Sequence, residues 1–337
     1  MFSPLIFITG STGFIGAHTV LQSLEAGYRV RLSVRKESQI SSLRTVFADH
    51  IANVDFVVIP NLSADGAHDG ALKDVTYIFH IASPMPGTGD DFKTEYLAPA
   101  VDSTTALLDA ANKTPSIKRV VIVSSVVALV PLEELATGNF HAKEGNNPSI
   151  AIDPDMPFPS DPEQNAMAKY SASKIFAHRA TLEWVASVKP SFTVVTLHPV
   201  FVFGQNLLQT KANSLEGTNG MLWGALHSES PFFNLMAVDV RDVAAAHVKA
   251  LSVDAEKGKV EEFLLHAGEA EGWTWEKVGE FAKGRYPAFG FKVQGAGPVT
   301  PTVDTTRARE KLGVKFRTMA DTLSSFLDHQ VKLRASL

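Results

Sequence analysis

The stretch that decides the fold is Phe7-Ile8-Thr9-Gly10-Ser11-Thr12-Gly13-Phe14-Ile15-Gly16. It joins an apolar run at 5–9, typical of a buried strand, to a helical pattern that starts at Phe14. Gly10 permits a tight turn, Gly13 lets the backbone approach a pyrophosphate, and Gly16 allows close packing of helix on strand. The helix N-terminus stabilises the anion. The spacing is Gly-x-x-Gly-x-x-Gly rather than the commoner Gly-x-Gly-x-x-Gly, and in this context it predicts a dinucleotide-binding turn.

Apolar runs and helical patterns alternate along the first two-thirds of the chain. The predicted strands are short and continuously apolar, as expected for strands buried on both faces, and lie at 5–9, 29–34, 54–59, 77–81, 120–124, 192–197 and 262–266. The predicted helices lie at 14–26, 39–49, 92–112, 163–189 and 240–251. This alternation predicts an α/β protein with a Rossmann-type, doubly wound parallel sheet.

Two parts of the chain break the alternation. We expect residues 1–200, with 235–266 returning to them, to form the dinucleotide-binding domain. We expect residues 201–234 and 267–337 to form a smaller C-terminal annexe that binds substrate. The segment 131–161 is rich in Pro, Gly, Asn and Asp, and we predict a loop or lid there.

The composition excludes several classes of function. With 337 residues, 45% of them hydrophobic, and a net charge of −5, the chain has no general attraction to nucleic acid or anionic lipid. It contains 0 cysteines, which excludes disulfides, thiolate catalysis and zinc–thiolate sites. Its 11 histidines lack metal-binding spacing, so we expect no metal. The first residues lack a basic segment and no apolar run reaches the ~18 residues of a membrane span, so we expect a cytoplasmic protein.

The end of the second predicted strand carries basic residues. An NAD-binding domain places Asp or Glu here to accept hydrogen bonds from the ribose. This chain has Arg35 and Lys36, with Glu37 one or two positions late. A guanidinium suits a 2′-phosphate, so the pattern favours NADP(H) over NAD(H), although Arg35 could also simply begin a solvated loop.

Three residues suggest proton-transfer chemistry. Tyr170 and Lys174 are four apart and therefore share a helix face, although this spacing also occurs by chance. Ser125 follows the fifth predicted strand, at the sheet edge where open α/β sheets bind ligands, although strand-end serines are often mere turn formers.

Taken in order, "TGSTGFIG", "SS", "YSASK" and "HPVFVFG" resemble the extended short-chain dehydrogenase/reductases over essentially the whole chain. Within them, "SVRKES", "IFHIASP" and "TPSIKRVVIVSS" resemble the dihydroflavonol and cinnamoyl-CoA reductase group, and "WTWEKVGEFAKGRYP" resembles the tail of fungal NADPH-dependent aldehyde and ketone reductases. The resemblance implies an NADPH-dependent reductase of a small aldehyde or ketone, active as a monomer or homodimer.

The resemblance also assigns roles residue by residue. It implies that Ser125 orients the carbonyl, Tyr170 donates the proton, and Lys174 lowers the tyrosine pKa. The implied cofactor contacts are Thr9, Gly10, Ser11, Gly13, Phe14, Ile15, Gly16, Arg35, Lys36, Leu62, Ala82, Ser83, Tyr170, Lys174, Pro199 and Val200. The implied substrate contacts are Ser83, Pro84, Ser125, Val126, Phe201 and Trp223.

The chain departs from the family pattern at three places. Asn61 replaces the Asp that often precedes the position of Leu62, and His198 replaces an Arg. We interpret His198 as a spectator, with a substrate-site role as the alternative. The asparagine of a proton relay found in some relatives is replaced near Ala100, which leaves the relay path open.

Two other functions remain in competition. Nucleotide-sugar epimerases and dehydratases share the glycine turn and the Tyr–Lys pair, but the dehydratases place an acidic residue near the serine, where this chain has Val126, Val127 and Ala128. A non-catalytic dinucleotide sensor typically lacks the Tyr–Lys pair. Asp239 and Asp242 fit helix capping better than catalysis.

Overall fold

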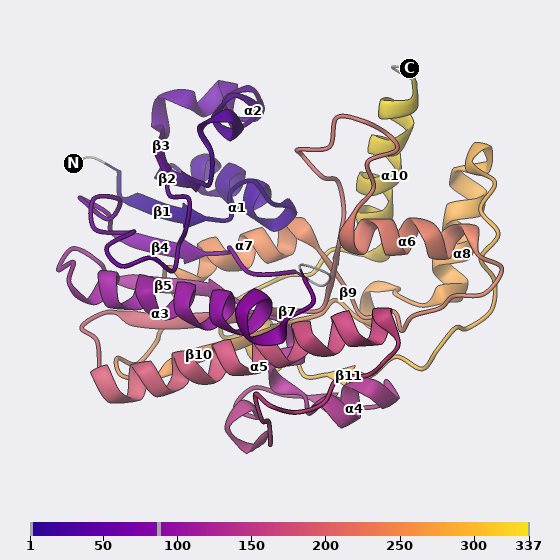
Figure 1. The fold of residues 1–337 in the computed structure, drawn as a ribbon. Helices are drawn as coiled ribbons and strands as arrows, with labels where there is room; N and C mark the ends of the chain where they lie inside the picture. The colour runs from indigo at the N-terminus through magenta and orange to yellow at the C-terminus, as the bar shows by residue number, and fades with distance from the viewer. Residues whose placement is uncertain (1–2, 86–88, 336–337) are drawn as a thin grey trace.

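A single parallel sheet forms the centre of the molecule (Figure 1). The computed structural model describes residues 3–85 and 89–335. The seven strands of this sheet lie in the order β10-β7-β5-β4-β1-β2-β3. Their bounds are β1 (Leu5–Thr9), β2 (Arg29–Val34), β3 (Val54–Val58), β4 (Tyr77–His80), β5 (Arg119–Val123), β7 (Thr193–Pro199) and β10 (Val260–Leu265). The chain reverses its direction of progress between β1 and β4, and ligands of such sheets bind at the carboxyl ends of the strands beside this point.

Helices cover both faces of the sheet. On one face α1 (Phe14–Glu25) packs against α7 (Val240–Ala250), and on the other α3 (Ala98–Asn112) packs against α5 (Pro162–Val188). The side chains of β1 alternate between two cores: Ile6 and Ile8 join the α1–α7 core, whereas Leu5 and Phe7 join the α3–α5 core. The α/β prediction with a doubly wound parallel sheet is confirmed.

The shorter elements connect this framework. The chain between β2 and β3 forms α2 (Ile40–Val46), and a π-helical turn at Lys93–Leu97 leads into α3. β8 (Phe201–Phe203) and β9 (Ala237–Asp239) form a small parallel pair outside the central sheet. The segment 235–266 therefore joins the layers of the central sheet only from α7 onward. The C-terminal elements are α6 (Gly217–His227), α8 (Trp275–Arg285), α9 (Thr306–Glu310) and α10 (Met319–Ala335). Trp273 and Trp275 are each 1% exposed and anchor this part.

The segment 131–161 is more ordered than the predicted loop or lid. It contains α4 (Leu132–Thr137) and β6 (His141–Ala142), which pairs with β11 (Thr302–Val303). Buried Asn147 donates from its amide to the carbonyls of Ala128 and Ile175, at 2.8 and 3.1 Å. Glu144 accepts the Leu264 backbone N–H at 3.0 Å. These bonds hold the segment along α5 and the free edge of β10. Most of its residues are irregular, as predicted for a loop, and a role as a lid stays a prediction.

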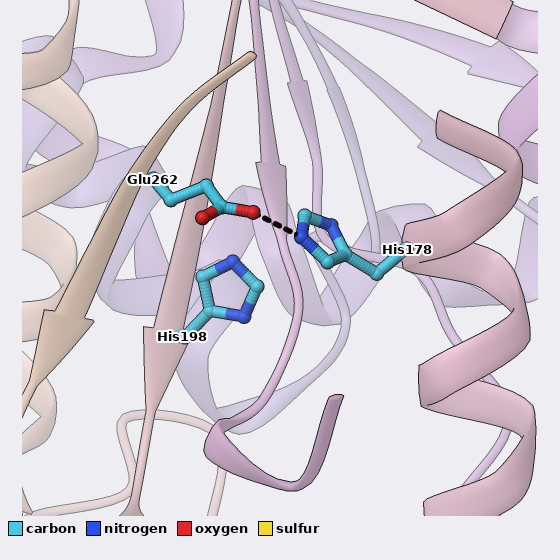
Figure 2. A group of neighbouring side chains, drawn as sticks. All are labelled: His178, His198 and Glu262. Atoms are coloured by element: carbon cyan, nitrogen blue, oxygen red, sulfur yellow. Dashed lines mark hydrogen bonds and ion pairs between the residues drawn. The ribbon is translucent and has the colours of Figure 1, made fainter. Parts of the chain in front are cut away.

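Three polar side chains tie α5 to β7 and to the edge strand β10 (Figure 2). His178 from α5, His198 from β7 and Glu262 from β10 are all buried. His178 donates from Nε2 to Glu262 Oε1 at 2.5 Å, and the rings of His178 and His198 meet edge to face with centroids 4.6 Å apart. Glu262 also accepts the Gly145 N–H. The cluster therefore joins α5, the sheet and the segment 131–161.

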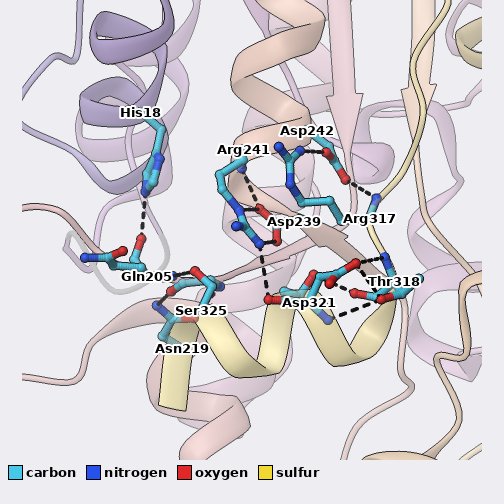
Figure 3. A network of polar contacts seen from close by, with 12 residues as sticks. His18, Gln205, Asn219, Asp239, Arg241, Asp242, Arg317, Thr318, Asp321 and Ser325 are labelled. Atoms are coloured by element: carbon cyan, nitrogen blue, oxygen red, sulfur yellow. Dashed lines mark hydrogen bonds and ion pairs between the residues drawn. The ribbon is translucent and has the colours of Figure 1, made fainter. Parts of the chain in front are cut away.

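A polar seam attaches α10 and the 205–219 segment to α1 and α7 (Figure 3). Asp239 caps α7 by accepting the Arg241 N–H at 2.7 Å, and it also accepts the Arg241 guanidinium, which reaches the Asp321 carbonyl of α10 at 3.2 Å. Asp242 accepts the Arg317 N–H at 2.7 Å. His18 of α1 contacts the Gln205 carbonyl at 2.7 Å. Asp239 is thus the N-cap of α7, as the sequence indicates, and Asp242 lies in the first turn of that helix, where its carboxylate binds Arg317.

The buried histidines predict how the free energy of unfolding depends on pH. Burial lowers the pKa to about 3 for His80 and His198, and to about 4 for His247 and His266. These imidazoles bind protons in the unfolded chain but stay neutral in the folded one. We therefore expect the free energy of unfolding to fall as the pH drops below about 6.5. Each such histidine contributes up to about 1.4 kcal/mol per pH unit in this window.

Urea unfolding between about pH 7 and about pH 5 measures this slope. His247→Leu should reduce the number of protons taken up on unfolding, and with it the slope, by roughly one, because the His247 ring is wholly buried. His141→Gln, at an exposed position, is the matched control and should leave the slope unchanged. An unaltered slope in His247→Leu would contradict the prediction.

Candidate active site

Ser125, Tyr170 and Lys174 meet at the carboxyl edge of the sheet. Ser125 follows β5, while Tyr170 and Lys174 lie one turn apart on α5. The Tyr170 hydroxyl shares a hydrogen bond with the Ser125 side chain. Lys174 Nζ lies 5.5 Å from the centre of the Tyr170 ring. The structure thus brings together the three residues that the sequence assigns to chemistry.

Helix α5 holds this pair rigidly. Its N-cap Asp161 accepts the Gln164 N–H at 3.0 Å, and Pro162 occupies the first helical position, where its missing N–H costs nothing. Lys169, beside the tyrosine, is only 8% exposed, and its Nζ donates to the Asp90 carbonyl at 2.5 Å. Lys169 therefore ties α5 to the 89–92 segment and takes no part in the Tyr–Lys pair.

Burial controls the charges of the pair. It raises the pKa of Tyr170, partly offset by the hydrogen bond with Ser125, and it lowers the pKa of Lys174 to about 8. Removing the tyrosinate from water outweighs the help of its neighbours, so the net pKa is raised, and the lowering expected from Lys174 stays a prediction. A raised pKa keeps Tyr170 protonated at neutral pH, as a proton donor requires.

His198 contacts the backbone of Ser125. Its Nδ1 lies 3.1 Å from the Ser125 carbonyl oxygen, and its Nε2 lies 2.9 Å from Thr196 Oγ1. Because a carbonyl only accepts, Nδ1 must carry the proton and Nε2 must accept from the threonine. His198 therefore fixes the backbone of Ser125, a role that sequence reasoning missed. Its place one residue before Pro199 in a buried strand was the available signal.

The glycine turn forms a cradle that side chains would fill. Gly10 has a φ of +73°, and a Cβ there would lie 2.6 Å from Ala82 N. A Cβ on Gly16 would lie 2.0 Å from the Gly10 carbonyl oxygen. Gly13 is the N-cap of α1 and offers no side-chain cap, which leaves the first N–H groups of this helix to a ligand. The cradle fits the pyrophosphate of a dinucleotide.

Polar side chains around the turn brace it. The Thr9 hydroxyl accepts the N–H groups of Ile81 and Ala82, at 3.1 and 3.2 Å, and donates to His80 Nδ1 at 2.9 Å. Ser11 Oγ donates to the Ser33 carbonyl at 3.2 Å. Both side chains hold strands together, so any cofactor contact of these two residues would come from their backbone.

The other predicted cofactor residues lie at the start of α1 or at the carboxyl ends of β2, β3, β4 and β7. Arg35 and Lys36 are exposed after β2; their backbone N–H groups donate to Gln39 Oε1, and their side chains have no partner among the described residues. Leu62 follows β3 and is half-buried. Phe14, Ile15, Ala82, Ser83 and Pro84 are also half-buried, whereas Pro199, the last residue of β7, and Val200 after it are buried.

The predicted substrate residues separate into two places. Val126, 3% exposed, follows Ser125, and half-buried Phe201 follows Val200 with its ring centre 5.3 Å from that of Phe233. Trp223 instead packs within the annexe. Its ring centre lies 5.1 Å from that of Phe289, and the Arg334 guanidinium lies 4.5 Å from it. The substrate role of each residue stays a prediction.

The His178–His198–Glu262 cluster also has the composition of a metal site. Its candidate ligand atoms lie within 4.8 Å of one another. Those atoms are already engaged, since Glu262 bonds to His178 and Gly145, and both nitrogens of His198 have partners. Sequence spacing could not reveal the cluster because its members come from three separate elements.

A comparison with protein families decides the family. Residues 6–265 match the model of the NAD dependent epimerase/dehydratase family. The chain belongs to this family.

No helix in the described residues is long and apolar enough to span a bilayer.

Individual relatives narrow the class. Ketoreductase sphI of Aspergillus fumigatus is 35% identical over 345 residues, which cover 98% of this chain and 99% of that protein. The putative NADPH-dependent methylglyoxal reductase GRP2 of Candida albicans is 34% identical over 269 residues, covering 76% and 77%. The crystal structure of Gre2 in complex with NADPH from Candida albicans superposes with a TM-score of 0.79 at 25% identity, covering 98% and 99%. Together these findings confirm the resemblance and identify an NAD(P)-dependent oxidoreductase of the extended short-chain dehydrogenase/reductase family.

The cradle predicts a sharp effect of one methyl group. Gly16→Ala forces the first turn of α1 away from the Gly10 carbonyl, so we expect nucleotide affinity to fall at least about ten-fold, or ~1.4 kcal/mol. Titration of the protein's tryptophan fluorescence with NADPH measures the change. Gly70→Ala, where an added Cβ meets nothing within 4 Å, is the control and should bind as wild type does. Equal affinity of the two variants would argue against the cradle.

Proposed function

We propose that the protein is an NADPH-dependent reductase that converts the carbonyl of a small aldehyde or ketone to an alcohol. The hydrogen bond between Tyr170 and Ser125, with Lys174 against the tyrosine ring, is the observation that carries this proposal. The names of the ketoreductase and methylglyoxal reductase relatives agree with it.

The chain's own residues perform the acid–base part of this reaction. NADPH supplies the hydride when it is bound. The two hydroxyls of Ser125 and Tyr170 would orient the carbonyl oxygen and stabilise the negative charge that develops on it. Tyr170, kept protonated by its raised pKa, then donates its proton to that oxygen. Lys174 keeps a positive charge beside the tyrosinate that remains.

Two basic side chains support NADPH over NADH. Arg35 and Lys36 are exposed at the end of β2 and unpaired within the described chain, so both are available to a 2′-phosphate. Asn61, beyond β3, keeps its amide nitrogen available for the adenine, because its Oδ1 accepts the Ser63 N–H at 3.0 Å. We further propose Ser83, Pro84, Val126 and Phe201 as the substrate contacts nearest the catalytic hydroxyls.

The family also contains epimerases, and the fold is shared with one. UDP-glucose 4-epimerase from Bifidobacterium longum superposes with a TM-score of 0.65 at 18% identity, which shows the fold alone. Next to Ser125 this chain has only the apolar side chains Val126, Val127 and Ala128, and no acid that could drive elimination. The reductase therefore explains the site better.

The proton-donor role predicts the effect of one oxygen atom. Tyr170→Phe should lower turnover by about 10²–10⁴-fold, because the developing alkoxide loses its acid, while NADPH affinity stays within about two-fold. The loss of NADPH absorbance, followed with a panel of aldehydes and ketones, measures turnover. Ser171→Ala, on the next helix position, is the control. If the wild-type protein binds NADPH tightly but no carbonyl compound of the panel causes NADPH to be oxidised, the reductase proposal fails and a non-catalytic sensor is favoured.

The cofactor preference depends on charge at the end of β2. Arg35→Asp should move the ratio of kcat/KM for NADPH to that for NADH toward NADH by about ten-fold or more, because a carboxylate repels the 2′-phosphate and accepts from the free ribose. Lys113→Asp makes the same charge change at the C-terminus of α3, at the opposite edge of the sheet, and should leave the ratio unchanged. An unchanged ratio in Arg35→Asp would mean that other residues read the phosphate.

A further inference from the structure

The connection between β3 and β4 is built from turns. Helices α1, α2 and α3 follow β1, β2 and β4, whereas the chain from 59 to 76, all of it described, forms no helix. Within residues 60–70 only His68 is buried, at 1% exposed, and the others are half-buried or exposed. One imidazole therefore anchors the first half of this connection, where an apolar side chain would pack without burying polar atoms.

The His68 ring joins this connection to β1. Its centre lies 6.0 Å from that of Phe7, edge to face, and its Nε2 lies 3.0 Å from the Leu62 carbonyl oxygen. Because a carbonyl only accepts, Nε2 carries the proton. Burial lowers the pKa of His68, so the ring is neutral at neutral pH, and its Nδ1 has no partner in the described structure. The single N–H of this ring thus serves Leu62.

The peptide group between Leu62 and Ser63 is held at both ends. Its carbonyl accepts from His68, and its N–H, which belongs to Ser63, donates to Asn61 Oδ1 at 3.0 Å. Because a backbone N–H only donates, the amide atom of Asn61 that faces it is the oxygen. The amide nitrogen of exposed Asn61 keeps both N–H groups available, with no partner among the described residues. Two hydrogen bonds in series thus connect His68 to the Asn61 amide.

This turn lies on the adenine side of the proposed nucleotide site. In the strand order β5-β4-β1-β2-β3, Ser125 follows β5 on one side of the glycine turn, and Asn61 lies beyond β3 on the other. With its pyrophosphate at the glycine turn and its nicotinamide toward Ser125, a dinucleotide extends its adenosine toward β2 and β3. Adenine offers acceptor nitrogens, and the Asn61 amide offers N–H donors. β3 is the edge of the sheet, so no further strand holds the turn in place.

We propose that His68 is a positioning residue for the adenine end of the cofactor site. Its hydrogen bond to the Leu62 carbonyl holds the Asn61 amide in the orientation from which that amide donates to the adenine. An apolar side chain would fill the same space with no unpaired nitrogen, so the contribution that only a polar side chain makes at position 68 is this N–H. The inference rests on the proposed binding of NADPH.

Two variants at position 68 separate the N–H from the packing. His68→Gln keeps a donor nitrogen, since the glutamine Nε2 is the same number of bonds from Cα as the imidazole Nε2. His68→Met is also unbranched and similar in length, but it has no donor. His247→Met is the matched control, because His247 is a wholly buried histidine of α7 with Nδ1 2.8 Å from the Val243 carbonyl and Nε2 unpartnered.

Calorimetric titration measures the effect on binding. The two ligands are NADPH and adenosine 2′,5′-bisphosphate, which carries the adenine and the 2′-phosphate without the nicotinamide. His68→Met should weaken both ligands by about five- to ten-fold, His68→Gln should stay within about two-fold of wild type, and His247→Met should change neither. In any carbonyl reduction, His68→Met should raise the KM for NADPH and leave kcat unchanged. Equal affinities of His68→Met and His68→Gln would overturn the proposal.

A double variant tests whether His68 acts through Asn61. Asn61→Leu removes the amide from a side chain of similar shape, and it should weaken adenosine 2′,5′-bisphosphate by itself. Adding His68→Met to Asn61→Leu should then weaken binding no further, because the two residues form one series of hydrogen bonds. Losses that simply add would show that His68 acts elsewhere and would overturn the proposal.

Nitrogen-15 NMR of the wild-type protein needs neither a variant nor turnover. It decides the proposal even if His68→Met does not fold or no carbonyl is reduced. His68 should be protonated at Nε2, and adenosine 2′,5′-bisphosphate should shift the side-chain amide signal of Asn61 but not that of Asn112, an exposed residue at the end of α3. A His68 protonated at Nδ1, or an Asn61 amide that the ligand leaves unshifted, would overturn the proposal.

Discussion

The close backbone approach at the first turn is the constraint on which the rest of the structure depends. Gly10 leaves no space for a Cβ against Ala82, and Gly16 leaves none against Gly10. This contact presses α1 onto the sheet at the point where the strand order reverses, and it directs the helix N-terminus at the ligand edge. Because all seven strands are parallel, their carboxyl ends share that edge, and Ser125 at the end of β5 lies there with Tyr170 of α5.

Burial sets the protonation states of the residues at that edge. The Tyr–Lys pair is taken out of water, so the tyrosine keeps its proton and the lysine holds its charge less firmly. The same burial makes each unpaired polar atom costly. The supports of the site, such as His198 beneath Ser125, are neutral and fully bonded.

The annexe joins the nucleotide-binding part through one continuous apolar core, and charged contacts add to it. Asp239 caps α7, Asp242 lies in the first turn of that helix, and both receive arginines, so one short segment ends a small strand, begins a helix and ties down α10. Such contacts are strong only when both partners are held in place, because a lone buried carboxylate is costly. The aromatic cluster around Trp223 then supplies the apolar interior of the annexe.

The sequence by itself determined the features that depend on neighbours along the chain. The strands, the glycine turn and the Tyr170–Lys174 spacing follow from local periodicity, and their positions agree with the structure within a few residues. Only the tertiary structure decided the features that depend on distant residues. The cluster of His178, His198 and Glu262 draws on three elements, and the order within 131–161 depends on the amide of Asn147. The raised pKa of Tyr170 depends on burial, which no spacing reveals, because desolvation is a property of the whole packed interior.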